Sequence, residues 1–433
     1  MAAFHFTRAV LLAGGLALAG SPVVAQTALD DCATQAASQY EAGYESIGRD
    51  MAAMDATAAV EACERALGEN PDSPQVKGWL ARAYLWAGES DKSVPLFEAA
   101  AAGDNVVALA LYGDMLIVGD GVDQDVARGT EMLQRGADLG FAPAQNSLGL
   151  SYDIGEGVAQ DQLQASRWYR AAAEQGLPRA QTNLGLMYLE GLGVDRDYIA
   201  AGAWLQRAAE RGDAKAQYNF GRIHELGLMV PIDYGLAVTY YQMAAGQGDM
   251  FAQNGLGYLI EQGLGVDANP AEAATYYGQA ADQGLAVAQY NLATLYETGK
   301  GVAQDYGMAF DLYTQAANAG DTDAAVNLAL LYLDGNGTTK DVAQALYWTQ
   351  LAADRGHPIG LNNLGHFYEN GLGVEADLAQ ARSFYQQSAD LGYAPGADNL
   401  RRLDAPVEPA TDAPPDGSFQ PLTEPYPPNK LDA

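Results

Sequence analysis

The sequence is poor in basic residues. Lys and Arg number 23 against 55 Asp and Glu, which gives the 433-residue chain a formal charge of −32. Nucleic acid and anionic lipid surfaces repel such a chain, so neither is an expected partner. An excess of acid spread over the surface is typical of a solubility adaptation, and this interpretation is favoured over attraction to a basic partner.

Long apolar runs are also scarce. One spans 9–19, about half of the roughly 20 residues that a membrane-spanning helix needs. Arg8 precedes it, and small residues at 23–25 follow it, which is the pattern of a signal peptide cleaved after Ala25. No cysteine directly follows the run, so we predict no lipid anchor or stable membrane insertion. The expected location is periplasmic or secreted.

Only two cysteines, Cys32 and Cys63, are present. In an exported chain they predict one structural disulfide, which closes a loop of about 30 residues and stabilises the N-terminal region by roughly 3 kcal/mol. A zinc or redox site would need closer spacing, such as CxxC, or a histidine nearby in sequence. We therefore predict no metal and no cofactor.

The sequence carries few signatures of catalysis. "IHELG" is not HExxH, no GxSxG elbow exists, and "DGNGTTKD" lacks the sixth-position glycine and the closing Glu of a calcium loop. His5 lies in the leader and His224 in a packing slot, whereas His357 ends a repeat and His366 lies in a first helix. The sequence predicts a protein that is not an enzyme.

A 36-residue repeat is the dominant positive feature. Eight consecutive units span 106–393 and a partial ninth follows at 394–403. Each unit carries a short segment such as "GLGVDRD", beginning in turn at Gly119, Gly155, Gly191, Gly227, Gly263, Gly299, Gly335 and Gly371. A nucleotide-binding loop is used once and is followed by GK[ST], so these segments are interpreted as turns.

Each unit is predicted to contain two helices. Apolar residues recur every three to four positions before and after the turn. Acidic or amide residues that suit N-caps open the second helix, at Asp125, Asp161, Asp197, Asp233, Asn269, Asp305, Asp341 and Asp377. Glycines close it, at Gly140, Gly176, Gly212, Gly248, Gly284, Gly320, Gly356 and Gly392.

The unit resembles the Sel1-like repeat, a relative of the tetratricopeptide repeat. It shares an Ala-x-Ala-Gln-x-Asn-Leu-Gly start, a Tyr before the turn, an aromatic pair in the second helix and an Ala-Ala-x-x-Gly end. Local departures are Met229, His224, Ile260, Ala293 and Ala329. The resemblance implies an all-α fold, a right-handed α/α superhelical solenoid of helix-turn-helix repeats, and a scaffold or adaptor role in the bacterial envelope.

The expected organisation has five parts. A signal peptide at 1–25 precedes tetratricopeptide-like hairpins at 26–105, with helices over 30–43 and 56–67 and a hairpin over 73–104. The eight repeats and the partial ninth follow. The last segment, 404–433, is rich in Pro and acid and is predicted to be disordered.

The candidate binding residues form an asparagine ladder. On a helical wheel, the residue before each Leu-Gly pair lies beside the buried stripe of the first helix, which lines the concave face of such a solenoid. Related tetratricopeptide proteins use an asparagine at this slot to hold the backbone of an extended peptide. The alternative is that these amides bond neighbouring helices. The slot holds Asn183, Asn219, Asn291, Asn327 and Asn363, with Ser147 and Gly255 in two other units.

Three function classes follow. We favour an exported, non-catalytic scaffold that binds a protein or peptide partner. A cell-wall or polysaccharide-handling factor, with glycan contact, is the alternative. A β-lactamase-like or penicillin-binding enzyme is disfavoured, because the Sel1-like proteins to which such activity is ascribed carry a cysteine pair in each repeat, whereas 106–393 contains no cysteine.

Overall fold

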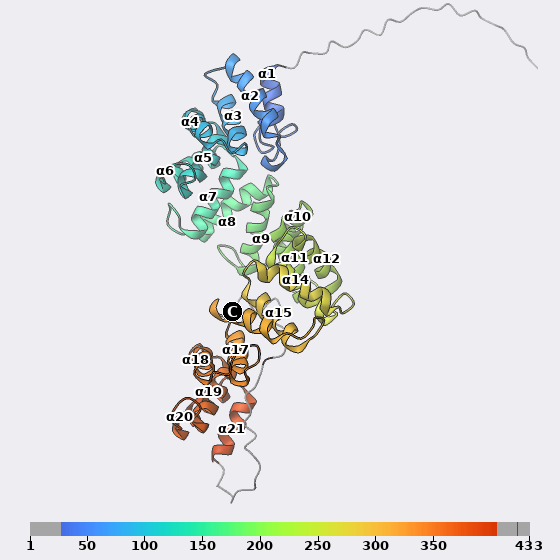
Figure 1. Cartoon of the computed structure of the whole chain (residues 1–433). Coiled ribbons are helices and arrows are strands. Elements are labelled where there is room, and N and C mark those ends of the chain that lie inside the picture. Colours follow the sequence, from blue (N-terminus) through green and yellow to red (C-terminus); the bar gives the residue numbers. More distant parts are fainter. Residues whose placement is uncertain (1–26, 405–421, 423–433) are drawn as a thin grey trace, which may run out of the picture. The chain divides into compact units, whose positions relative to one another are not determined.

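The computed structural model describes residues 27–404 and Leu422. The signal-peptide prediction, and the prediction of disorder for all of the tail except Asp404 and Leu422, fall on residues outside this description. The chain divides into two compact units, Met1–Asp161 and Gln162–Ala433. Each unit is described by itself below, with the helices labelled as in Figure 1.

The N-terminal unit contains seven helices and one 3-10 turn, η1, within its described residues. Their bounds are α1 Ala28–Ala36, η1 Met51–Ala53, α2 Ala56–Glu69, α3 Pro74–Trp86, α4 Ser90–Ala101, α5 Val106–Val118, α6 Val126–Asp138 and α7 Ala142–Ile154.

The C-terminal unit continues the same alternation of helices and turns. Its helices are α8 Gln162–Glu174, α9 Pro178–Glu190, α10 Tyr198–Glu210, α11 Ala214–Leu226, α12 Tyr234–Ala245, α13 Met250–Gln262, α14 Pro270–Asp282, α15 Ala286–Thr298, α16 Tyr306–Asn318, α17 Thr322–Asp334, α18 Val342–Asp354, α19 Pro358–Asn370, α20 Leu378–Asp390 and α21 Ala394–Asp404. The described residues hold no strand, and an isolated bridge joins Ser38 to Arg49. The predicted all-α solenoid of helix-turn-helix repeats is confirmed.

Local chemistry sets the helix ends. At seven second helices the predicted N-cap accepts a hydrogen bond from a backbone N–H in the first turn: Asp125, Asp197, Asp233, Asn269, Asp305, Asp341 and Asp377. These bonds satisfy amides that have no partner within the helix. Asp161 also has an interaction partner. The first glycine of each turn caps the first helix in the left-handed conformation, as at Gly191, where φ is 76°. That conformation costs glycine little because it has no Cβ.

The glutamine of the repeat motif joins successive 36-residue repeats. Gln217, buried at the start of α11, donates from Nε2 to the carbonyl oxygen of Ala209 near the end of α10, at 3.1 Å. The same bond recurs every 36 residues, from Gln145, Gln181, Gln253 and Gln289. Each carbonyl also accepts from the N–H of the glycine that ends the helix, as Ala209 does from Gly212 at 3.0 Å, so the glutamine adds a second bond in the last turn. This bond explains why the motif carries Gln beside a buried Ala.

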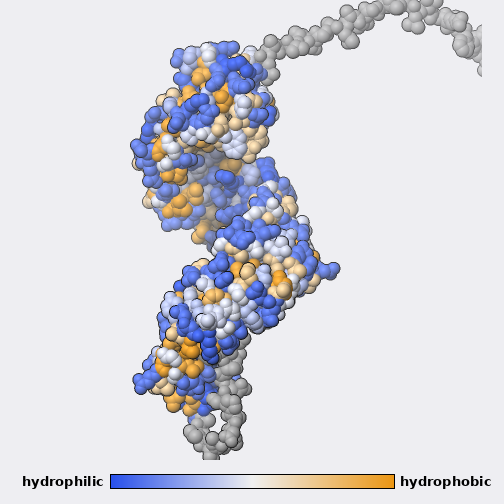
Figure 2. Space-filling model, in the orientation of Figure 1, coloured by the Kyte–Doolittle hydropathy of each residue, from blue (hydrophilic) through white to orange (hydrophobic). Residues whose placement is uncertain are grey.

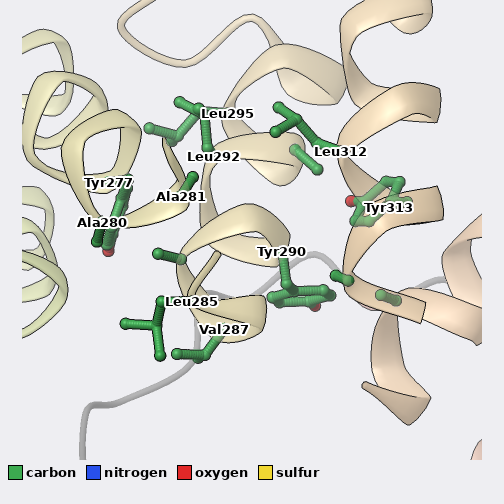
Figure 3. Packing of buried hydrophobic residues seen from close by; sticks show 14 of the residues in the cluster. Tyr277, Ala280, Ala281, Leu285, Val287, Tyr290, Leu292, Leu295, Leu312 and Tyr313 are labelled. Carbon is green, nitrogen blue, oxygen red and sulfur yellow. The ribbon is translucent and has the colours of Figure 1, made fainter. Parts of the chain in front are cut away.

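Small and aromatic side chains fill the core of the C-terminal unit. Tyr277, Tyr290 and Tyr313 are almost fully buried among alanines and leucines of α14, α15 and α16, as Figure 3 shows. The rings of Tyr290 and Tyr313 lie 5.8 Å apart between centroids. Alanine lets neighbouring helices approach closely, and the tyrosines fill the remaining space between them. On the face shown in Figure 2, exposed apolar side chains are dispersed among polar ones.

The N-terminal unit has its own core around Trp79. The predicted disulfide between Cys32 and Cys63 is present, joins α1 to α2 and lies within this core. Trp79 is fully buried and donates from Nε1 to the Glu41 carboxylate at 2.9 Å. Its ring meets Tyr44 edge-on, with 4.9 Å between centroids.

The predicted helix over 30–43 is wrong in its second half. Helix α1 ends at Ala36 and irregular chain follows. The buried guanidinium of Arg82 accounts for the early end of the helix. It donates to the carbonyl oxygens of Ala36, at 2.7 Å, and Arg49, at 2.8 Å. Irregular backbone leaves those carbonyls available, and the paired bonds offset part of the cost of burying the charge.

The second glycine of the turn makes a contact between repeats. A Cβ built on Gly337 would lie 2.0 Å from the carbonyl oxygen of Tyr306, which begins the second helix of the preceding unit. Glycines 193, 265 and 301 approach the equivalent backbone in the same way. Met229 replaces this glycine in one repeat, and its thioether lies over Gly202 on α10. Gly202 has no side chain, which leaves room for the side chain of Met229.

Candidate peptide-binding groove

The five predicted ladder residues all lie in the C-terminal unit, at the same position of its first helices. They are Asn183 on α9, Asn219 on α11, Asn291 on α15, Asn327 on α17 and Asn363 on α19. Asn183 is half-buried and the other four are buried. The sequence pattern therefore brings five amides onto one series of stacked helices.

The amides take different partners. Asn219 donates to the carbonyl oxygen of Lys215 in its own helix, at 2.8 Å, and Asn291 donates to Asn254 on α13, at 3.0 Å. Asn363 accepts from the neighbouring Asn362 at 3.4 Å. Of these three bonds, the one from Asn291 joins two helices, as the alternative interpretation of the ladder describes, and the other two lie within one helix. Asn183 also has an interaction partner.

Asn327 differs because it holds the backbone of a residue far along the chain. Its Nδ2 donates to the carbonyl oxygen of Leu422 at 2.6 Å, and its Oδ1 accepts from the Leu422 N–H at 2.9 Å. One amide thus pairs with both polar groups of a single residue, as one strand of a sheet pairs with another. The Leu422 side chain is half-buried and packs against the hydrophobic core of the unit.

A buried relay fixes the orientation of the Asn327 amide. Tyr313 donates from its hydroxyl to Glu297 at 2.7 Å and accepts from Asn327 Nδ2 at 3.0 Å. Because the Tyr313 proton is used on Glu297, the hydroxyl can only accept from Asn327, and the Asn327 oxygen must face the Leu422 N–H. The relay presents a donor and an acceptor to a peptide backbone in a set order.

A recess opens beside another ladder residue. It measures about 570 Å³ and lies between α9 and α11, where Asn219 forms part of its wall. Glu190, Arg196 and Arg222 line it together with leucines such as Leu186. The wall offers charges of both signs and apolar surface, which suits a polypeptide ligand better than a small apolar molecule.

Sequence reasoning missed two residues that bond to the ladder or extend it. Asn399 lies 36 residues after Asn363 and donates to Asn362 at 2.9 Å, so it continues the ladder into α21. The 36-residue spacing was the available signal. Leu422 is the second, and no local pattern connects it with Asn327, 95 residues earlier.

Tyr–Glu hydrogen bonds recur in the core of the C-terminal unit. Besides Tyr313, the hydroxyls of Tyr241, Tyr277 and Tyr385 donate to Glu225, Glu261 and Glu369, at 2.5, 2.9 and 2.7 Å. Burial raises the pKa of Glu225, opposed by the Tyr241 hydrogen bond and by the positive charge of Arg222. At Glu369 the hydrogen bonds and charge of Arg402, with the Tyr385 bond, outweigh burial and lower the pKa.

Glu225→Gln should gain stability relative to the wild type as pH rises. A carboxyl whose pKa is raised by folding contributes its full stability below its unfolded pKa, near 4.3, and loses it as pH rises through the folded value. Glutamine keeps an acceptor for Tyr241 but carries no charge. Urea unfolding at pH 4 and pH 7 should show the variant's relative stability increasing at the higher pH.

The exposed residue Glu210 supplies the control for this measurement. Glu210→Gln removes one negative charge from the surface of the same unit, so it corrects for the change in net charge. If the two variants showed the same pH dependence relative to the wild type, burial of Glu225 would not be the cause.

Two histidines, His224 and His357, have structural contacts. His224 is buried in the predicted packing slot, where its ring meets Phe220 edge-on at 4.8 Å, and burial lowers its pKa. His357 caps α19 by accepting from the Gly360 N–H at 3.1 Å, and it also contacts Asp323.

Across residues 27–404, no group of three or more His, Cys, Asp or Glu is placed to hold a metal ion. None of the described helices is long and apolar enough to cross a membrane.

The paired helices, their 36-residue period and the polar slot repeated on the first helices define a helical-repeat solenoid, a class that commonly mediates protein–protein interaction. The chain belongs to the Sel1 repeat family. Eight matches to the Sel1 repeat cover residues 106–141, 142–177, 178–213, 214–249, 251–285, 286–321, 322–357 and 358–393, and a tetratricopeptide repeat matches 50–111.

Two solved structures are similar over most of the chain. A protective antigen of uropathogenic Escherichia coli with an SLR fold is 30% identical, with a TM-score of 0.55 over 81% of this chain and 83% of the antigen. A Sel1 repeat protein from Oxalobacter formigenes is 31% identical, with a TM-score of 0.54 over 72% of this chain and 90% of that protein. A comparison with curated proteins gives no match.

Proposed function

We propose that the protein is an exported, non-catalytic adaptor that binds an extended polypeptide partner along the asparagine ladder of its C-terminal unit. The observation that carries the proposal is the pair of hydrogen bonds between Asn327 and the backbone of Leu422. A ligand held by its backbone needs regularly spaced donor–acceptor groups, which the 36-residue repeat supplies.

The disulfide supports the export part of the proposal. Disulfides persist in oxidising compartments such as the bacterial periplasm or the extracellular medium, and Cys32 and Cys63 are bonded here. An adaptor role in the bacterial envelope agrees with this location. Clear hydrolysis of nitrocefin by the purified chain would contradict the non-catalytic part.

Selection from a displayed peptide library tests the binding role. The wild-type chain and a variant with alanine at Asn183, Asn219, Asn291, Asn327 and Asn363 are used as bait, once circular dichroism shows that both are folded. We expect peptides enriched on the wild type to bind the variant at least tenfold more weakly, because each amide that holds the peptide backbone contributes roughly 1 kcal/mol or more.

The control replaces exposed amides on second helices. Gln206→Ala and Gln386→Ala remove side chains whose described bonds go to acids of their own helices, so peptide binding should stay at the wild-type level. Equal binding by the wild type and the five-asparagine variant would move the site away from the ladder.

A further inference from the structure

We propose that the site at Asn327 selects a leucine-like residue in an extended, proline-flanked peptide, and that the chain's own Leu422 segment is the resident occupant which a partner must displace. The inference rests on the proposed function of the ladder. It adds the chemistry of the ligand and an intramolecular competitor.

The contact at Leu422 has two components. Asn327 donates to the Leu422 carbonyl oxygen and accepts from the Leu422 N–H, so both hydrogen bonds involve only backbone atoms of the occupant and suit any residue with a free N–H. The Leu422 side chain packs against the hydrophobic core of the unit and is half-buried there. Burial of a branched apolar side chain is favourable whereas burial of a polar one is not, so this contact supplies the side-chain preference.

The sequence around Leu422 suits recognition through the backbone. It reads "SFQPLTEPY" over 418–426, with Pro421 directly before Leu422. Proline-rich segments favour an extended conformation without internal hydrogen bonds, so their N–H and C=O groups need outside partners. Proline also lowers the conformational entropy that binding removes.

The length of the intervening chain supports an occupant from the same molecule. Helix α21 ends at Asp404, so residues 405–421, 17 in number (421 − 404), separate it from Leu422. A segment of that length spans up to about 60 Å when extended. Three helices, α18, α19 and α20, lie between α17 and α21. The path therefore crosses four helix-to-helix steps of about 8–10 Å each. The tail therefore reaches Asn327 with chain to spare.

Tethering makes the tail a strong competitor. A segment tethered through a linker of this length acts at an effective concentration near the millimolar range. A peptide offered from solution at micromolar concentration must displace it. Removing the Leu422 anchor should therefore raise the apparent affinity for an added peptide.

Fluorescence anisotropy with a labelled peptide of sequence SFQPLTEPY tests this competition on full-length chains. We expect Leu422→Asp to bind the peptide at least tenfold more tightly than the wild type, because the tail no longer fills the site. Adding Asn327→Ala to Leu422→Asp should weaken binding at least tenfold. A peptide with aspartate in place of its leucine should bind Leu422→Asp at least tenfold more weakly.

Two further variants keep the test decisive. Tyr313→Phe, in the Leu422→Asp background, keeps the buried ring but removes the hydroxyl that orients Asn327, so it should weaken binding even if Asn327→Ala fails to fold. Asn183→Ala, four repeats away, should leave binding unchanged, because a nine-residue peptide spans only about 30 Å.

The contrary outcomes are distinct. Equal affinity of the wild type and Leu422→Asp would overturn the competition, and so would wild-type affinity that rises on dilution, since the occupant would then come from a second copy. Failure of SFQPLTEPY to bind Leu422→Asp, while library-selected peptides still bind in an Asn327-dependent way, would overturn this inference alone. Loss of both kinds of binding would overturn the proposed function as well.

Discussion

Replacement of both cysteines by serine, Cys32→Ser with Cys63→Ser, is expected to lower the free energy of unfolding of the N-terminal unit by about 3 kcal/mol. The bond closes a loop with a sequence separation of 31 residues, and opening it restores conformational freedom to the unfolded chain. Helix α1 is only nine residues long, too short to be stable without its contacts to the rest of the core.

Hydrogen exchange resolved along the full-length chain measures this effect. Exchange in α1, α2 and α3 should accelerate by roughly a hundredfold, which corresponds to about 3 kcal/mol. Helices α13 to α16 serve as an internal control, because they belong to the other unit and should exchange at the wild-type rate. Unchanged protection in α1 and α2 would mean that the core around Trp79 holds this region without the bond.

Gly337→Ala is expected to destabilise the C-terminal unit by about 3 kcal/mol. Glycine adopts a φ of 70° there, and a left-handed conformation costs alanine roughly 1 kcal/mol or more. The added methyl would also lie 2.0 Å from the Tyr306 carbonyl oxygen, so the backbone of α16 must move. Overpacking of this kind costs a further 1–3 kcal/mol or so.

Gly356→Ala separates the two contributions. Gly356 has nearly the same φ, 75°, but a Cβ built there would meet no atom within 4 Å. Its replacement should cost only about 1 kcal/mol. Urea unfolding followed by circular dichroism compares the two variants, and equal losses would show that the second turn glycine serves the turn and not the contact between repeats.

The glycine pattern also shows how far sequence reasoning reaches. The turn and both of its bends were predictable because left-handed glycines and N-cap residues act on backbone within a few positions of themselves. The close approach of Gly337 to Tyr306 was not predictable, because a glycine needed for a turn and a glycine needed for a contact look the same in sequence.

Helix ends in the N-terminal unit show the same division. The helix expected over 30–43 stops at Ala36 because Arg82, 46 residues away, takes the Ala36 carbonyl. Local propensity contains no information about that partner. By contrast, the pairing of Cys32 with Cys63 followed from the presence of only two cysteines.

The sequence by itself determined the period of the repeat, the paired helices, their caps and the slot that carries the asparagines, because each depends on chemistry repeated within 36 residues. Only the tertiary structure decided what each asparagine holds. An amide has donors and an acceptor that many groups can satisfy, so the choice depends on which neighbours folding brings near. For Asn219 the neighbour is its own helix, for Asn291 the adjacent one, and for Asn327 the backbone of Leu422.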